Sequence, residues 1–337
     1  MSEVETRATW GDGWIKGLAA KFAEVENQAD QSYSLAIDSA LGVETNKATR
    51  LFRERTSDKA EEKTTNKTGV GYPVLTTEGQ DYATDSRIPG YRTVYKFIKK
   101  TLSIEITEEE KDDRDNDLQD KFDEAKDLRI GMMMEFDRSA FSILNYAFTA
   151  QASLPSVLTF YSDGKPLCSV GHPRKDGGTA QSNASATGIP LTETNLETGR
   201  QALRRQLDDR GLPMNIGSGR IVLLVPDSLE KSAVIYTKST KRSGTANNDL
   251  NIYDGIVTVI STKWINSQNG GSDTAWFLID SMYSPLVFYR RQGIRTSVYM
   301  DNKNKNTIYD ISARWQVGNK NWRGVWGSKG DSAAYTG

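Results

Sequence analysis

The sequence has almost none of the residues on which most enzyme and metal sites depend. Its 337 residues include one cysteine, Cys168, and one histidine, His172. A single cysteine excludes an internal disulfide framework and a multi-cysteine metal site, and a single histidine leaves little for acid–base chemistry near neutral pH. No second cysteine or histidine completes a nucleophile–base pair or a ligand set, so we interpret His172 as a loop residue with a structural hydrogen bond.

The sequence also lacks an excess of charge of one sign and any long apolar run. The 43 Lys and Arg residues balance 44 Asp and Glu residues, for a net charge of -1, which argues against binding nucleic acid or an anionic membrane through overall charge. No stretch approaches the roughly 18 apolar residues of a membrane span, and the N-terminus lacks the features of a secretory signal. We therefore expect a protein made in a cytoplasm, of about two domains, with no membrane partner.

One acidic run partly matches a calcium loop. Asp113, Asp115, Asp117 and Glu124 occupy positions one, three, five and twelve of the EF-hand spacing. Position six of that loop needs glycine for a sharp turn, whereas this chain has Leu118 there. Because the run is acidic throughout, such a spacing arises readily by chance, and we interpret it as the solvated face of a helix.

Other short motifs also match only in part. Ser228 and Lys231 form an SxxK pair and Lys67-Thr68-Gly69 a KTG triplet, but their order is the reverse of that in penicillin-binding enzymes and the SDN element is missing. The N-terminal glycines lack the strand and spacing of a dinucleotide fingerprint, and no P-loop occurs. The sequence therefore predicts no catalytic residue, no cofactor and no metal site.

What the chain does contain is an extended segment that leads directly into a long helical pattern. Residues Tyr72 to Ile106 combine Pro and Gly with alternating apolar residues, which predicts a two-stranded hairpin. Such a ribbon is marginal in water by itself, so it needs a surface to lie on. Thr107 and Glu110 then form a capping box, and an apolar stripe at helical spacing continues to Phe148. If the helix were continuous, it would span roughly 60 Å at 1.5 Å per residue.

The remaining segments predict an arm and a compact α+β unit. Arg53 to Lys67 is highly charged, and we expect it to be ordered only by something it touches. Thr194 and Glu197 form a second capping box for a helix that Gly211 ends. Arg220 to Pro226 predicts a strand buried on both faces, followed by a helix. Further strands are predicted at 255–261, 275–280, 286–290, 295–300 and 307–315, and a cluster of tryptophans, Trp315, Trp322 and Trp326, predicts a docked C-terminal segment.

Several of these segments, in this order, resemble the major capsid proteins of tailed bacteriophages with the HK-97-type fold, and most closely the major head subunit family of Mu-like phages. The likeness covers about residues 65–330. The segments that carry it are Glu78-Gly79 with Gly90-Tyr91, Leu102–Glu108 with Asp112-Asp113, Gly171-His172-Pro173 with Gly177-Gly178 and Ser182-Asn183, Ile221–Pro226 with the helix after it, and Tyr309–Trp315 with Trp322-Arg323-Gly324.

The resemblance implies an α+β fold with the parts of that family. These are an N-terminal arm (1–65), an extended loop or hairpin (66–106), the first part of a peripheral domain with the spine helix (107–218), an axial domain (219–292), and a return to the peripheral domain with the C-terminal tail (293–337). The subunit-interface candidates are Trp10, Trp14, Arg53, Glu78, Gly79, Arg87, Tyr91 and Lys96.

The function that the resemblance implies is mechanical. Many copies of the chain, as hexamers and pentamers, would form the icosahedral head of a virion around double-stranded DNA that they contact without sequence specificity. The other implied partners are a separate scaffold protein, a portal at one vertex and a decoration protein. Some relatives crosslink a loop lysine to an asparagine; Lys96, Lys99 and Lys100 are available here, but lysines in a hairpin more often protect its edge.

Two alternatives remain open from the sequence. The first keeps the fold and changes the contents, as in the shell of a cellular nanocompartment filled with protein. The second is an intracellular enzyme or calcium-binding protein that only resembles a shell subunit. The contents of the particle distinguish the first alternative, and a small monodisperse particle with a ligand or substrate would indicate the second.

Overall fold

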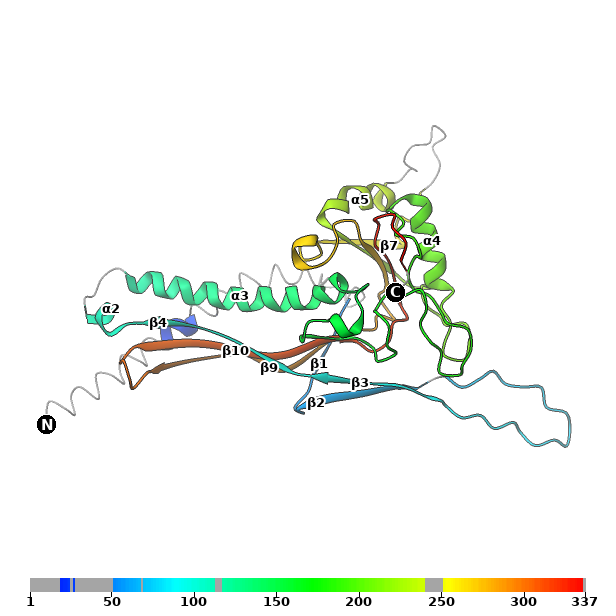
Figure 1. Ribbon diagram of the computed structural model, residues 1–337, viewed down its shortest axis with the longest axis horizontal. Helices are drawn as coiled ribbons and strands as arrows, with labels where there is room; N and C mark the ends of the chain where they lie inside the picture. Colours follow the sequence, from blue (N-terminus) through cyan, green and yellow to red (C-terminus); the bar gives the residue numbers. More distant parts are fainter. Residues whose placement is uncertain are drawn as a thin grey trace.

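The computed structural model describes residues 19–24, 27, 51–67, 69–112, 117–239 and 251–335. The molecule is elongated (Figure 1). A long helix lies along a sheet of long strands at one end, a second sheet with its own helices forms the other, and a loop protrudes beyond both. No helix in the ranges just named is long and apolar enough to cross a membrane.

The first sheet has five strands and is built on a long antiparallel hairpin. Strand β9 (Leu286–Met300) and strand β10 (Thr307–Asn319) pair along almost their whole length. Strand β1 (Arg53–Thr56) adds parallel to β9, whereas β4 (Ile98–Ile106) pairs antiparallel and the short β5 (Leu158–Thr159) parallel to β10. The segments predicted as separate strands at 286–290 and 295–300 are thus one strand, because both lie along β10.

The helix on this sheet begins as predicted. In α2 (Glu108–Asp112) the Thr107 amide donates to Glu110 Oε2 at 2.8 Å, and the Glu110 amide donates to Thr107 Oγ1 at 3.2 Å, which confirms the capping box. Helix α3 (Asp117–Asn145) follows; residues 113–116 lie outside the described ranges. From Ala125 onward the predicted apolar stripe is buried, and Phe136 packs edge-on against Trp315 of the sheet with ring centroids 4.6 Å apart.

The second sheet has the strand order β11-β8-β6-β7. Its central strand β6 (Ile221–Pro226) is buried at every residue, as the apolar run predicts. Strand β7 (Val257–Thr262) pairs parallel to β6, β8 (Trp276–Asp280) antiparallel to β6, and β11 (Val325–Ser328) antiparallel to β8. The helices beside this sheet are α4 (Glu193–Arg204) and α5 (Glu230–Lys238), and single 3-10 turns occur at Gln151–Ser153, Asp227–Leu229 and Ser267–Asn269.

The predicted hairpin within residues 72–106 pairs differently from the expectation. Strand β3 (Pro89–Lys96) pairs antiparallel with β2 (Glu61–Lys67), and only Phe97 separates β3 from β4, which belongs to the five-stranded sheet. The charged segment, expected to be ordered only by something it touches, therefore supplies two strands, which pair with β9 and β3 of the same chain. Backbone hydrogen bonds form a strand ladder without apolar side chains, so the residues of β1 and Lys63 of β2 can stay exposed.

Two further expectations need correction. The cap of α4 is Thr192, whose hydroxyl accepts from the Asn195 amide at 3.2 Å, and not Thr194. This start buries Leu196 and Leu203 on one face of the helix. The predicted boundary at residue 292 falls inside β9, and β11 crosses back to the four-stranded sheet, because the edge of β8 is available there. The three C-terminal tryptophans are buried, which confirms the docked C-terminal segment.

Candidate assembly interface

Strands β2 and β3 form a two-stranded ribbon, and residues 69–88 between them form what we call the protruding loop (Figure 1). The base of the ribbon lies on the five-stranded sheet, where Tyr95 and Phe97 pack against Val287 and Tyr289. At the tip of the loop the Gln80 amide donates to the Thr77 carbonyl at 3.2 Å and Gly79 has φ 83°. This tight turn needs positive φ at its third residue, which explains the glycine.

The protruding loop exposes large apolar side chains. Leu75 is 96% exposed and Tyr82 is 89% exposed, more than any other large apolar residue in the described chain. Soluble single chains rarely display such a group together, and where they do the surface usually meets another molecule. The complete set on the loop is Val70, Tyr72, Val74, Leu75 and Tyr82.

An ion pair holds what we call the neck of the loop, the place near Gly71 and Asp85 where the two legs of the loop lie close together. Arg210 binds both carboxylate oxygens of Asp85, at 2.5 Å from Nη1 to Oδ2 and 2.9 Å from Nη2 to Oδ1, and it also donates to the Ser86 carbonyl. The Gly71 amide, on the other leg of the loop, donates to the same carboxylate at 2.6 Å. The hydrogen bond from Arg210 is the main reason why the pKa of Asp85 lies well below its usual range.

Two more contacts tie the ribbon to the body of the molecule. The Asn66 side chain donates to the Lys320 carbonyl at 2.7 Å. Tyr91 packs edge-on against Tyr161 with ring centroids 5.6 Å apart, and the Lys175 ammonium lies 3.8 Å from the centre of the Tyr91 ring. The loop therefore projects from a fixed base.

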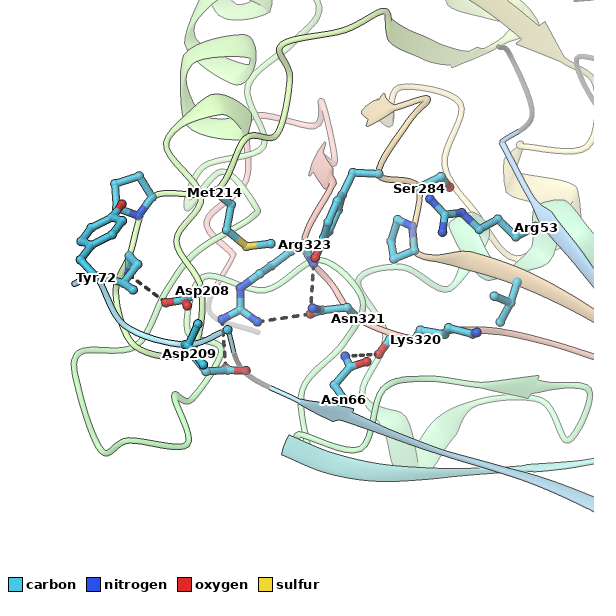
Figure 2. Close-up of a pocket in the computed structure, with 17 residues that line it drawn as sticks. Arg53, Asn66, Tyr72, Asp208, Asp209, Met214, Ser284, Lys320, Asn321 and Arg323 are labelled. Carbon is cyan, nitrogen blue, oxygen red and sulfur yellow. Dashed lines mark hydrogen bonds and ion pairs between the residues drawn. The ribbon is translucent and has the colours of Figure 1, made fainter. Parts of the chain in front are cut away.

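A pocket of about 570 Å³ lies where the neck of the loop meets the two sheets. Figure 2 shows Arg323 directed toward Asp209, at 3.0 Å, and toward Asn321. Arg53 and Lys320 also line the pocket. Burial, followed by the nearby Arg55 and Arg53, lowers the pKa of Lys320. The pocket thus combines the Arg323–Asp209 ion pair with two further cations, Arg53 and Lys320.

The structure brings some of the predicted interface residues together and separates others. Glu78, Gly79 and Arg87 are exposed on the protruding loop, and Lys96 is exposed on β3. Tyr91 is half-buried by the contacts described above. Arg53 lies on β1, where its guanidinium donates to the Met282 carbonyl at 2.6 Å. Trp10 and Trp14 lie outside the described residues.

Sequence reasoning missed the apolar side chains of the loop and the Asp85–Arg210 pair. The apolar residues carried a signal: Val70, Tyr72, Val74 and Leu75 lie close together in a stretch with Gly and Pro. The sequence pattern predicts only that they belong to an extended loop or hairpin (66–106), without a role for their side chains. The ion pair carried no signal, because 125 positions separate its two residues in the chain.

The motif-based candidates have structural roles. His172 is buried, with Nδ1 2.7 Å from Asp163 Oδ2, Nε2 3.0 Å from Asn183 Oδ1, and its ring stacked on Trp322. This confirms the prediction of a loop histidine held by hydrogen bonds. Cys168 is fully buried, and burial raises the pKa of its thiol, which opposes the thiolate that a nucleophile requires.

The other motifs likewise form no site in the described chain. Ser228 donates its hydroxyl proton to the Asp273 carbonyl, and Lys231 lies in α5. Asp113 and Asp115 lie outside the described ranges, whereas Asp117 and Glu124 belong to α3. Among the residues that the structure describes, no three His, Cys, Asp or Glu side chains gather as metal ligands would.

The architecture is that of a capsid subunit with the HK-97-type fold: a long helix on a long-stranded sheet, a second α+β unit and a protruding loop. Two solved structures with this fold are similar to the chain. The capsid of Ralstonia phage GP4 matches at a TM-score of 0.53 and 12% identity over 87% of this chain and 90% of that one. The capsid of cyanophage P-SCSP1u matches at 0.51 and 10% identity over 82% and 85%.

The family follows from the sequence itself. A family model described as phage capsid protein matches residues 90–328, well over half of the chain. The chain therefore belongs to the phage capsid protein family. A search of curated proteins found no match.

Proposed function

We propose that the chain is the major capsid protein of a tailed phage and that its copies assemble, as hexamers and pentamers, into the icosahedral head around double-stranded DNA. Family membership supports the class of protein. The observation that carries the assembly is the protruding loop, because its apolar side chains are exposed in a single copy and a neighbouring copy would cover them.

The parts of the molecule take their names from this proposal. The five-stranded sheet with α2 and α3 is the peripheral domain, the four-stranded sheet with α4 and α5 is the axial domain, and the ribbon with the protruding loop is the extended loop that reaches the next subunit. A scaffold protein, a portal at one vertex, a decoration protein and packaged DNA complete the set of proposed partners. The chain would be made in the host cytoplasm and reside in the virion.

The experiment that tests the proposal is negative-stain electron microscopy of the purified protein, produced alone and together with the products of neighbouring genes. We expect closed shells or rings of the size of capsomers. A matched variant replaces residues 74–82 by a short Gly-Ser linker and keeps Gly71 and Asp85, so that the neck of the loop remains intact. This variant should remain folded and soluble and should not close shells.

The outcomes separate the proposed function from the alternatives. Uniformly small particles from the wild-type chain under both conditions would overturn the assembly function. Normal shells from the linker variant would overturn the role of the loop. The nucleic acid content of purified shells, measured from their absorbance ratio, distinguishes a phage head from a protein-filled compartment.

A further inference from the structure

At the neck of the protruding loop, one carboxylate connects the two legs of the loop to each other and to the body of the molecule. Asp85 lies on the returning leg of the loop and accepts from Gly71 on the outgoing leg, and Arg210 binds this carboxylate and the Ser86 carbonyl at the same time. Both legs of the loop are therefore connected to the turn that carries Arg210. We call this set, Gly71, Asp85, Ser86 and Arg210, the clasp.

The turn on the body side of the clasp is itself rigid. Asp208 Oδ1 accepts from the Arg210 amide at 2.7 Å and from the Leu212 amide at 2.8 Å, and Gly211 has φ 77°. The next residue toward the core, Asp209, binds the buried Arg323. The Arg210 side chain therefore extends from a base that is anchored in the interior of the molecule.

Side-chain packing does little to fix the direction in which the loop projects. Of residues 72–87, all except Thr76 are exposed, and none lies in a helix or strand. An exposed segment without regular structure takes its direction from its attachment points. The polar clasp lies beyond the last ribbon pair, Lys67 and Pro89, and so nearer to the exposed part of the loop.

The energetics of the pair indicate positioning more than stability. The Asp85 side chain is 43% exposed and that of Arg210 is 18% exposed. Ion pairs in such solvated positions contribute little to folding, because water screens the charges and holding the side chains in place costs entropy. A bidentate guanidinium–carboxylate pair, in contrast, fixes geometry strongly, because its two parallel hydrogen bonds allow only one relative orientation.

We propose that Asp85 and Arg210 are a positioning pair that fixes the angle at which the protruding loop leaves the molecule and thereby orients it toward the next subunit. This proposal rests on the proposed function, since it assumes that the loop meets another copy. On this proposal, the choice of contact with the next subunit depends partly on Asp85 and Arg210, although these residues need not touch that subunit.

The test compares loop geometry with assembly. Arg210→Lys keeps the charge and loses the fork, and Asp85→Asn keeps the shape and loses the charge. Arg200→Lys is the matched control, because Arg200 forms the same bidentate contact with Glu197 on α4, away from the loop. Each change is made in a chain with two labelled cysteines, Thr77→Cys at the loop tip and Lys231→Cys on α5, and the buried Cys168 is left unlabelled.

We expect the distance distribution between the two labels, measured by electron spin resonance on unassembled subunits, to broaden in both clasp variants and to stay narrow in the control. Shell formation, followed by light scattering, should slow by about tenfold in the clasp variants, because a loop with a broader range of directions meets the next subunit less often in the productive orientation. The thermal midpoint of the subunit should change by no more than about 2 °C, as expected for a surface pair.

The results that would overturn the proposal are specific. An unchanged distance distribution in Arg210→Lys and Asp85→Asn would show that the pair does not set the angle. Wild-type assembly rates with a broadened distribution would show that the angle does not matter for assembly. If the wild-type chain forms no shells, the proposed function fails and the orientation toward a neighbour fails with it, whereas the distances measured on the subunit still report separately on the clasp.

Discussion

At the residue scale, two buried polar side chains of one loop, His172 and Asn183, are each held by more than one partner. Asn183 is an example: its side chain accepts from the Ser169 amide at 2.8 Å, donates to the Leu167 carbonyl at 2.9 Å and contacts His172. Buried donors and acceptors are costly to leave unpaired. The chain's only histidine and its partners therefore serve the fold of a loop, which is also hydrogen-bonded to β11 through Asn183 and Gly327.

The first residue-scale prediction concerns His172. His172→Ala removes the partner of Asp163 and Asn183 and leaves a gap beside Trp322. We expect the free energy of unfolding to fall by about 3 kcal/mol, as measured by urea denaturation. Arg87→Ala, an exposed change on the loop, is the control and should have an effect of less than about 0.5 kcal/mol. Equal losses in the two variants would contradict the structural role of His172.

The second residue-scale prediction concerns pH. Hydrogen bonds from Arg200 are the main reason why the pKa of Glu197 is lowered to about 2, and Gln201 and the Tyr253 hydroxyl contribute. The unfolded chain, with its ordinary glutamate pKa, takes up the proton first as the pH falls. The stabilisation by this carboxylate is therefore complete above about pH 4.5 and is lost as the pH falls toward 2.

Glu197→Gln should reduce this acid sensitivity. Because solvent screens the partly exposed pair, we expect the loss of stability between pH 4.5 and 2 to be smaller by about 1 kcal/mol in the variant. Urea denaturation at a series of pH values measures it, with Glu78→Gln at the loop tip as the control. A pH profile identical to that of the wild-type chain would refute the assignment.

At the scale of elements, close approach decides where glycine is needed. Helix α4 packs against the four-stranded sheet at Gly199, where an added Cβ would lie 2.7 Å from the Trp326 ring and 3.0 Å from Leu278. Helix α3 also contains a glycine, Gly131, but an added Cβ there would meet nothing within 4 Å. The same residue type thus has opposite consequences in the two helices.

The corresponding prediction is a pair of alanine substitutions. Gly199→Ala should lower the free energy of unfolding by about 2 kcal/mol, because it forces the helix away from the sheet. Gly131→Ala should raise it by about 0.5–1 kcal/mol, because alanine restricts the unfolded chain and favours helix. Both values can be measured by denaturant titration. A destabilised Gly131→Ala or a stabilised Gly199→Ala would contradict the packing described here.

At the scale of the whole molecule, the apolar surface is divided between two places. The two sheets and their helices bury most large apolar side chains, whereas the protruding loop carries five of them into solvent. This division is unfavourable for a solitary chain and favourable for one that assembles, because the area exposed on the loop is buried in the contact. Substitutions on the loop are consequently expected to change assembly while they leave the stability of the subunit almost unchanged.

Leu75→Ser tests this separation. The thermal midpoint of the subunit should stay within about 1 °C of the wild-type value, since Leu75 is almost fully exposed. The lowest protein concentration at which shells form should rise at least about tenfold, because each contact loses the burial of a leucine side chain, about 2 kcal/mol. Thr77→Ala is the neighbouring control. Shell formation at the wild-type concentration would exclude Leu75 from the contact.

The predictions from sequence succeeded where the pattern is local. The capping box at Thr107, the buried stripe of α3 and the fully buried strand β6 all depend on residues within a few positions of one another. They failed where partners are distant. The charged sequence of β2 shows no strand periodicity. Nothing in the local pattern therefore indicates that β3 pairs with β2 and not with β4.

The sequence alone determined the class of this protein and much of its secondary structure, because periodicity, caps and the order of motifs are written in neighbouring residues. Tertiary structure decided the pairing of β2 with β3, the exposure of Leu75 and Tyr82, and the clasp between Asp85 and Arg210. The physical reason is that strand pairs and ion pairs depend on which segments meet in space. From its sequence, β3 could pair with β2 or with β4; because β4 pairs with β10 in the five-stranded sheet, β2 is left as the partner of β3.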